Sequence, residues 1–441
     1  MIIDRLPSFV QGFFSPMRAR VSKPQFRHLW SVVLGAVVTL RAAKVSHLAA
    51  AAPENGHRTS KGSFLSRSGW DAPALVDQAS MGLLAGMKPR PGEVAYLILD
   101  DNRIPKRGRK MQWVSKLWDH KQQTFVRGHI ALTAAVLFRG VVLPWRVELW
   151  KPRGHAGTPR YRKLTDMAAA LVRAFVPPDG VTVRVLFDAF YLCPRVARAC
   201  GARGFTFFSV AARNRSFTPD RAGGKRAGGG TGTAKGNKAK NKAKNKAKKI
   251  GRLMPGLIRY KGRDVRMKRA RGKTARLRVA KADGTLSRIG RVRMVVSKRP
   301  RGPWKKCIAI VTSETGLKPR QIVAIYELRW NVEVLFKELH QGLGLGDYQM
   351  LAKDGIVHHP HVCCLAHLLL THQSLAGLGA KARKPNTTVP LPPMSRRLAD
   401  LRTHIAQDQI ERLVPGDQHA TLRKKLRDYL LDQSDQLAAA A

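Results

Sequence analysis

The sequence predicts an α/β fold with a mixed β-sheet at its core, helical regions at both ends and a basic, largely β insertion. Between residues 92 and 212, apolar strand-like segments alternate with segments of helical periodicity. In residues 213–315, basic and apolar residues alternate as in a half-buried sheet. Hydrophobic residues make up 44% of the 441, which is enough for most of the chain to bury a core.

The charge of the chain indicates a polyanionic partner. Lysine and arginine number 81 against 28 acids, a formal net charge of +53. Such an excess repels itself in the folded state unless counterions or a polyanion neutralise it, and nucleic acid is the usual polyanion. A ribosomal-type or coating protein is the alternative, and an anionic membrane surface is the weaker one. The five cysteines form no CxxC pair, which fits a reducing cytoplasm.

Residues 1–91 are expected to be helices and loops. The apolar run from Leu29 to Leu40 resembles a secretory signal at first sight. Its lead is too long for a signal peptide, and the run is too short to span a bilayer. We therefore expect a buried helix here and no membrane partner.

The core elements of residues 92–212 follow in a recognisable order. The expected elements are a strand over 95–101, strands over 125–138 and 141–150, a helix over 161–175, a strand over 181–188, a helix over 194–200 and a strand over 205–212. Two of the apolar strands end in acids, at Asp100 (followed by Asp101) and at Asp188. A charge at such a place is costly unless it has a partner or a function.

The insertion over 213–315 begins with a lysine-rich segment, residues 221–250, in which NKAK occurs three times. It holds almost nothing apolar, so we expect a disordered loop. Either it attracts phosphates without sequence preference or it is a solvated insertion. Strand-like alternation follows over 257–313, with a basic face.

A single long helix is expected from Pro319 to the glycines at 342 and 344, within a region of supporting helices over 316–380. At about 100° per residue, one face of this helix carries basic and polar residues around a single acid. These residues are Tyr326, Arg329, Glu333, Lys337 and His340. Ordinary surface pairs at i,i+4 are the alternative interpretation.

Asp100, Asp188 and Glu333 together would make an oxygen-rich site suited to Mg²⁺ or Mn²⁺. Two such ions about 4 Å apart can activate a water or a 3′-hydroxyl and stabilise the leaving oxygen of a phosphodiester. Basic residues around these acids would hold a DNA strand.

The order LILDD, VLFDAFY and Y-x2-R-x3-E resembles the DDE transposases of bacterial insertion sequences, specifically the IS4-like group. The resemblance implies an RNase H-like core, Asp100, Asp188 and Glu333 as metal ligands, and Tyr326 and Arg329 on DNA phosphates. His340 stands where the group has lysine, and Lys337 is the expected substitute. Asn102 replaces a usual threonine after Asp100, and Asp101 remains the alternative ligand.

Trp330 follows the signature arginine, where some members of the group stack a flipped base. A core tryptophan is the alternative. The resemblance thus predicts a cytoplasmic transposase, acting as a homodimer on DNA, that cleaves the ends of an insertion sequence and joins them to target DNA. It also predicts that the helical region of residues 1–91 binds the DNA ends. An inactive relic, a basic DNA-binding protein and an RNase H-like nuclease without strand transfer are the alternatives.

Two further patterns have structural interpretations. The histidines and cysteines of residues 358–372 favour a buried helix, with a zinc site as the alternative, because no CxxC or HxxxH frame completes them. A Pro-rich linker and a terminal helical region are expected over 381–441.

Overall fold

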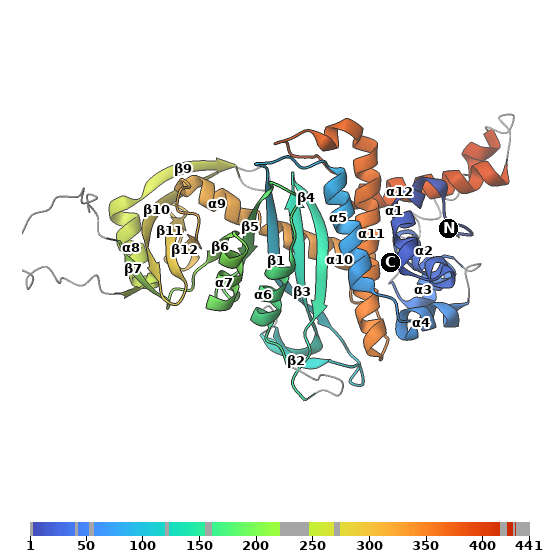
Figure 1. The fold of residues 1–441 in the computed structure, drawn as a ribbon, viewed down its shortest axis with the longest axis horizontal. Coiled ribbons are helices and arrows are strands. Elements are labelled where there is room, and N and C mark those ends of the chain that lie inside the picture. Colours follow the sequence, from blue (N-terminus) through green and yellow to red (C-terminus); the bar gives the residue numbers. More distant parts are fainter. Residues whose placement is uncertain are drawn as a thin grey trace, which may run out of the picture. The chain divides into compact units, whose positions relative to one another are not determined.

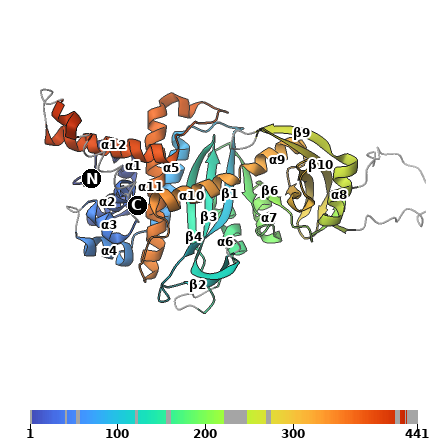
Figure 2. The same cartoon turned by 180° about the vertical axis from the view of Figure 1, so that it is seen from behind.

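A computed structural model of the protein describes residues 3–39, 43–52, 57–119, 123–154, 161–220, 247–268, 274–414, 421–426 and 428. They form two compact units (Figures 1 and 2). The first unit comprises Met1–Met167, Val176–Thr182 and Asn331–Ala441. The second comprises Ala168–Phe175 and Val183–Trp330. The second unit is therefore inserted into the chain of the first.

The sheet of the first unit contains four antiparallel strands. Its strands are β1 (Val94–Pro105), β2 (Ser115–Asp119), β3 (Thr124–Phe138) and β4 (Val141–Leu149). The order is β2-β3-β1, and β4 also pairs with β3. The predicted turn at Arg139 and Gly140 joins β3 to β4, with both residues at positive φ, 47° and 85°. Two positive φ values give the tight turn that matches the twist of a hairpin.

Strand β1 is longer than the sequence indicates. The expectation that it ends at Asp100 or Asp101, with a basic loop after it, is wrong. Residues 101–105 continue the ladder with β3, as far as Pro105 opposite Gly128. Backbone pairing with the long β3 outweighs the poor strand propensity of these polar residues. Asp100 therefore lies in the interior of the strand.

The first unit also contains the helices that precede and follow this sheet in the chain. Those of the N-terminal region are α1 (Gln11–Phe14), α2 (Lys23–Val38), α3 (Val45–Ala50), α4 (Arg58–Arg67) and α5 (Ala72–Gly86). Helix α5 packs on β4 together with α11 (Lys353–Leu378), and Figure 1 shows both beside that strand. Residues 29–38 of α2 are all buried, as the buried-helix interpretation expects. The C-terminal helix α12 (Met394–Leu413) packs on α11 and α2.

The histidine-rich segment belongs to α11, the one helix of the described residues that is long and apolar enough to cross a membrane. Of its most apolar window, 56% is buried inside the protein. His358 bonds the carbonyl oxygens of Leu65 and Trp70, and His359 bonds that of Ala43. Burial lowers the pKa of His359 to about 4. These imidazoles fasten α11 to the N-terminal helices, which accounts for them without zinc.

The second unit is a mixed sheet flanked by helices. Its strands are β5 (Thr182–Phe187), β6 (Thr206–Val210), β7 (Ser216–Pro219), β8 (Lys248–Lys249), β9 (Arg263–Lys268), β10 (Thr274–Leu286), β11 (Gly290–Lys298) and β12 (Ile308–Thr312). They follow the order β5-β6-β12-β11-β10-β7-β8, with β9 on β10. β5 and β6 are parallel, and the other described pairs are antiparallel. The mixed α/β fold is confirmed.

The insertion extends the core sheet, because β12 pairs directly with β6. Its start differs from the prediction: residues up to Lys261, expected to be strand-like from 257, belong to helix α8 (Ile250–Lys261). Most of the lysine-rich loop predicted over 221–250, residues 221–246, lies outside the described residues. Helices α6 (Leu164–Ala174) and α7 (Pro194–Ala202) form where the sequence predicts them.

The predicted long helix is interrupted. Helix α9 (Pro319–Glu327) ends before Leu328, and α10 (Trp330–Leu343) begins after Arg329. The backbone N–H groups of Leu328 and Arg329 bond carbonyl oxygens three residues back, which tightens the chain into a turn. The boundary between the two units falls one residue later. One helical wheel therefore cannot describe Tyr326 and Glu333 together.

Candidate active site

Helix α10 has one buried face and one polar face. Val332, Leu335, Leu339 and Leu343 are buried in the first unit. The partly exposed Glu333 and His340 and the exposed Lys337 project on other sides of the helix. Gly344, at φ 68°, follows the helix and ends it as predicted, whereas Gly342, also expected at the stop, lies in the last turn of α10. A Cβ at Gly344 would meet Asp347 and Ala43, so glycine is needed at this turn.

A hydrogen bond joins the polar face of α10 to strand β1. The Asn102 amide Nδ2 donates to Nε2 of His340 over 2.6 Å. Asn102 is two residues after Asp100 in β1, so the two side chains leave the same face of the sheet. His340 is seven residues after Glu333, about two helical turns, so these two share a helix face. The bond therefore sets the Asp100 side of β1 against the Glu333 side of α10, and Figure 2 shows α10 crossing this sheet.

This arrangement favours Asp100 over Asp101 as the site carboxylate. Successive side chains of a strand leave opposite faces, so Asp101 points away from the face that meets α10. The backbone N–H of Asp101 donates to Oδ1 of Asp100 over 3.0 Å. That bond holds the Asp100 carboxylate close to the strand.

His340 occupies the position at which the resemblance expects a lysine. Unlike a lysine side chain, its imidazole does not carry a positive charge at neutral pH. Burial lowers its pKa below the ordinary value of 6.5, and the neighbouring Lys106 lowers it further against the raising effects of Leu345 and Asp347. The imidazole is therefore neutral at pH 7. Its partner Asn102 is itself the residue that replaces the usual threonine, so the two departures from the family pattern contact each other.

We expect His340→Ala and Asn102→Ala to slow strand cleavage by about 10–100-fold while leaving DNA affinity unchanged, because each loosens the contact between β1 and α10. The double variant should be no slower than either single variant. Cleavage rate and DNA affinity, measured separately in a double-mutant cycle, check this. A role of His340 on a DNA phosphate predicts the opposite: weaker DNA binding and additive losses. Arg103→Ala, on the other face of β1, is the matched control.

The turn after α10 is held by a half-buried lysine. Lys106 Nζ donates to the carbonyl oxygens of Gly346 and Tyr348, the latter over 2.8 Å, and lies over the Tyr348 ring. The Tyr348 hydroxyl bonds Nδ1 of His129 at 2.7 Å. Burial lowers the pKa of Lys106 to about 7. The end of β1 and the end of α10 are thus joined a second time.

Glu338, the second acid of α10, is held by two partners in neighbouring helices. Glu338 Oε2 accepts from Nε2 of His367 and from the guanidinium of Arg397, each over 2.9 Å. Burial alone would raise the pKa of Glu338, but the hydrogen bonds and charges of His367 and Arg397 outweigh it and lower the pKa. Glu338 therefore anchors α10 to α11 and α12, which leaves Glu333 as the acid of the polar face.

Asp188 belongs to the second unit and directly follows β5, as predicted. Its Oδ1 accepts from the backbone N–H groups of Phe190 and Tyr191, over 2.8 and 3.4 Å. The hydroxyl of Ser209, in the neighbouring parallel strand, donates to the Asp188 carbonyl oxygen over 2.9 Å. The carboxylate is thus oriented by its own turn at the carboxyl end of a parallel strand, where α/β folds place their chemistry.

The signature residues before Glu333 also belong to the second unit. Tyr326 lies in the last turn of α9, Arg329 lies in the turn after it, and Trp330 begins α10. Trp330 is 43% exposed, so the interpretation of it as a core tryptophan is wrong.

The structure brings Asp100 and Glu333 onto facing surfaces of the first unit. The other predicted site residues, Asp188, Tyr326, Arg329 and Trp330, belong to the second unit. Within the described ranges, no group of three or more His, Cys, Asp or Glu is placed to hold a metal ion.

A family model described as DDE superfamily endonuclease matches residues 16–274, more than half of the chain. The chain belongs to the DDE superfamily of endonucleases. The matched range contains Asp100 and Asp188 and ends before Glu333. The assignment of Glu333 in this DDE endonuclease therefore rests on the sequence signature and on the facing of α10 and β1.

The DDE endonuclease is also similar to a curated protein, the probable transposase for insertion sequence element IS701 from Microchaete diplosiphon. The two are 29% identical over 149 residues. The match spans about a third of each protein, 33% of this chain and 36% of the relative.

Proposed function

We propose that this DDE endonuclease is the transposase of a bacterial insertion sequence, related to the IS4-like group, and that it cleaves the element's ends and joins them to target DNA. The observation that carries the proposal is the Asn102–His340 bond, which sets the Asp100 face of β1 against the Glu333 face of α10. The similarity to a probable insertion-sequence transposase and the net charge of +53 support it. A homodimer acting on chromosomal DNA in the cytoplasm is part of the proposal, since two ends must be paired.

Asp188 completes the proposed set of ligands. β5 starts at Thr182, whose N–H donates to the Glu93 carbonyl oxygen over 2.8 Å, immediately before β1 starts at Val94. Six residues lead from Val94 to Asp100, and six lead from Thr182 to Asp188. The order of the acids in the IS4-like group makes Asp188, which like Asp100 stands six residues after the start of its strand, the second proposed ligand.

The three carboxylates suit the divalent ions that the family implies, because hard oxygen donors are what Mg²⁺ and Mn²⁺ prefer. Two bound ions would activate the attacking hydroxyl and stabilise the leaving oxygen of the phosphodiester. Asp100, Asp188 and Glu333 would hold them, and Tyr326, Arg329 and Lys337 would fix the phosphate. The exposed Trp330 would stack on an unpaired base at the cut.

Cleavage and joining of a DNA end test the proposal. The full-length protein is incubated with a duplex carrying one end of its own element, taken from the sequence that flanks the gene, and a supercoiled target plasmid. We expect nicking at the element's boundary and covalent insertion of the 3′ end, both with Mg²⁺ or Mn²⁺ and neither with EDTA. Cutting without joined product would identify a nuclease, and binding without cutting would identify an inactive relic.

A further inference from the structure

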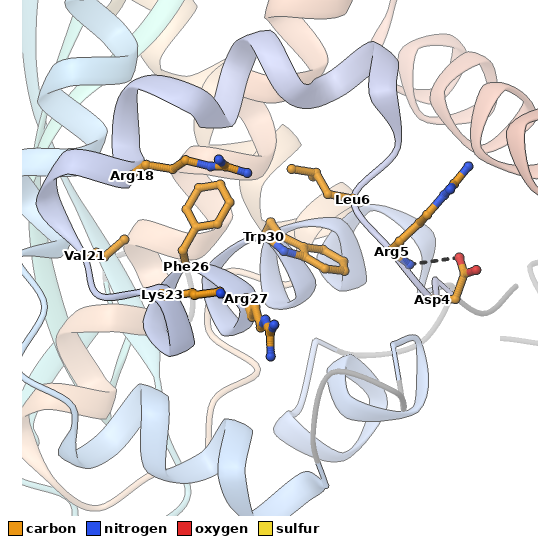
Figure 3. A pocket seen from close by; sticks show the side chains of 9 residues that line it. All are labelled: Asp4, Arg5, Leu6, Arg18, Val21, Lys23, Phe26, Arg27 and Trp30. Atoms are coloured by element: carbon orange, nitrogen blue, oxygen red, sulfur yellow. Dashed lines mark hydrogen bonds between the residues drawn. The ribbon is translucent and has the colours of Figure 1, made fainter.

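The N-terminal region contains a cavity of about 630 Å³, in the size range of ligand sites. It lies between the first residues of the chain, the segment before α2, and α2 itself (Figure 3). Two layers of side chains line it. Phe26 and Trp30, one helical turn apart on α2, are buried and form its apolar wall. The cationic side chains at its rim are Arg5, Arg18, Lys23 and Arg27.

The positive charge of this cavity is not balanced by the protein. Asp4 is the acid that lines it, and its carboxylate is held by Arg412 through two bonds of 2.6 and 2.9 Å. That contact, opposed by burial, lowers the pKa of Asp4, so the acid is ionised and already paired. In the part of the chain that the structure describes, no carboxylate forms an ion pair with Arg18, Lys23 or Arg27.

The arrangement of the cations differs from that of scattered surface charges. The Arg18 guanidinium lies over the Phe26 ring, 4.9 Å from its centroid, which fixes its position while its N–H groups remain at the rim. Lys23 and Arg27 are one turn apart on the same face of α2, where two like charges repel. Lys23 also stands in the first turn of α2, which contains no acid and where the helix dipole disfavours a cation. An anion would relieve both the repulsion between Lys23 and Arg27 and the unfavourable dipole at Lys23.

We infer that this cavity is a DNA-backbone site, in which Arg18, Lys23 and Arg27 hold consecutive phosphates of a duplex outside the cleavage site. The inference rests on the proposed function, since it takes the end of the element as the natural duplex. Guanidinium and ammonium groups recognise phosphate by charge and hydrogen bonds, so the contact fixes position without reading sequence. The buried rings stiffen the floor and are not stacking surfaces, because Phe26 is 8% and Trp30 5% exposed.

The test measures only DNA binding by the full-length protein, using fluorescence anisotropy with a labelled duplex. The salt concentration is varied from about 50 to about 200 mM, because affinity that depends on phosphate contacts falls steeply over this range. The variant is Lys23→Gln with Arg27→Gln. We expect at least about a tenfold loss of affinity and a salt slope shallower by about 2, since each phosphate contact contributes about 0.9. The loss should be the same for an element end and for an unrelated duplex.

Arg20→Gln is the matched control, because Arg20 is an exposed arginine of the same region that does not line the cavity. Its salt slope should equal that of the wild type. If the double variant behaves like Arg20→Gln, the inference is wrong. Lys23→Arg with Arg27→Lys keeps the charges and should keep the slope, which separates loss of the site from misfolding.

A small-anion site is the outcome that would also overturn the inference. Inorganic phosphate added at constant ionic strength should displace the duplex no better than chloride does. Displacement at micromolar phosphate would show a site for a free anion. The experiment measures binding and not cleavage, so the two proposals can fail separately. A wild-type protein that binds DNA through this cavity but never cuts it would contradict the proposed transposase and would still support the phosphate site.

Discussion

Asp188→Ala and Glu333→Ala should each reduce strand cleavage by at least about 10³-fold, because each removes a carboxylate that we propose as a metal ligand, worth several kcal/mol of transition-state stabilisation. Asp100→Ala should behave in the same way. Binding of the element's end should remain within about threefold of the wild type, since phosphate contacts elsewhere dominate affinity. Single-turnover cleavage and DNA affinity, measured on the same preparations, check both statements.

Asp101→Ala is the control for this series. It removes a carboxylate next to Asp100 that leaves the opposite face of β1, so cleavage should persist. Asp100 and Asp101 therefore compete directly: loss of cleavage in Asp101→Ala and survival in Asp100→Ala would reverse the assignment. Survival of cleavage in both Asp188→Ala and Glu333→Ala would contradict the proposed site altogether.

Glu93→Gln should lower the free energy of unfolding by about 3–5 kcal/mol, the range found when one partner of a buried ion pair is removed. Glu93 and Arg139 form such a pair in the first unit, with side chains 5% and 3% exposed. The carboxylate also accepts from the backbone N–H groups of Asn386 and Arg90, each over 2.9 Å. Without its charge, the Arg139 guanidinium is left buried and uncompensated. Urea unfolding measures the loss.

An exposed pair provides the comparison for Glu93. Arg396 and Asp400 on α12 are 71% and 42% exposed, so Asp400→Asn should change stability by less than about 1 kcal/mol. A Glu93→Gln protein as stable as Asp400→Asn would contradict a structural role for the buried pair.

The ion pair of Glu93 and Arg139 also makes the stability of the protein depend on pH in the acid range. The Arg139 hydrogen bond, opposed by burial and helped by Asn386 and Arg90, lowers the pKa of Glu93 from 4.5 to about 2. The unfolded chain therefore takes up this proton first as the pH falls. The contribution of Glu93 is full above pH 4.5 and is lost as the pH drops towards 2. The stability difference between wild type and Glu93→Gln should shrink across that window.

The sequence predicts the fold class because hydrophobic periodicity is local and strong here. The buried stretch of α2, the hairpin at Arg139 and Gly140 and the position of Asp188 after β5 are all visible in short windows. The extension of β1 past Asp100 and the existence of β2 are not, since both depend on pairing with β3. The interruption at Leu328 contains neither proline nor glycine, so no residue in that window indicates it.

The candidate site could be predicted from the sequence only in part. The acids of two apolar strand segments and a helix signature predict Asp100, Asp188 and Glu333 as site residues, but the contact between Asn102 and His340 spans 238 residues. A single sequence offers no signal for such a distant pair except that both residues depart from the family pattern. The cavity beside α2 could not be predicted from the sequence either, because its arginines come from separate segments of the chain.

The interleaving of the two units has a consequence for synthesis on the ribosome. Residues 183–330 emerge as one continuous stretch and can begin to fold as soon as they appear. The first unit must wait, because α10 and the central helix α11 are encoded after residue 330. The nascent chain therefore contains both aspartates well before the helix with Glu333 is made. Under the proposed function, a truncated translation product would retain the basic N-terminal helices and could occupy DNA, but it would lack the third proposed ligand and could not cut.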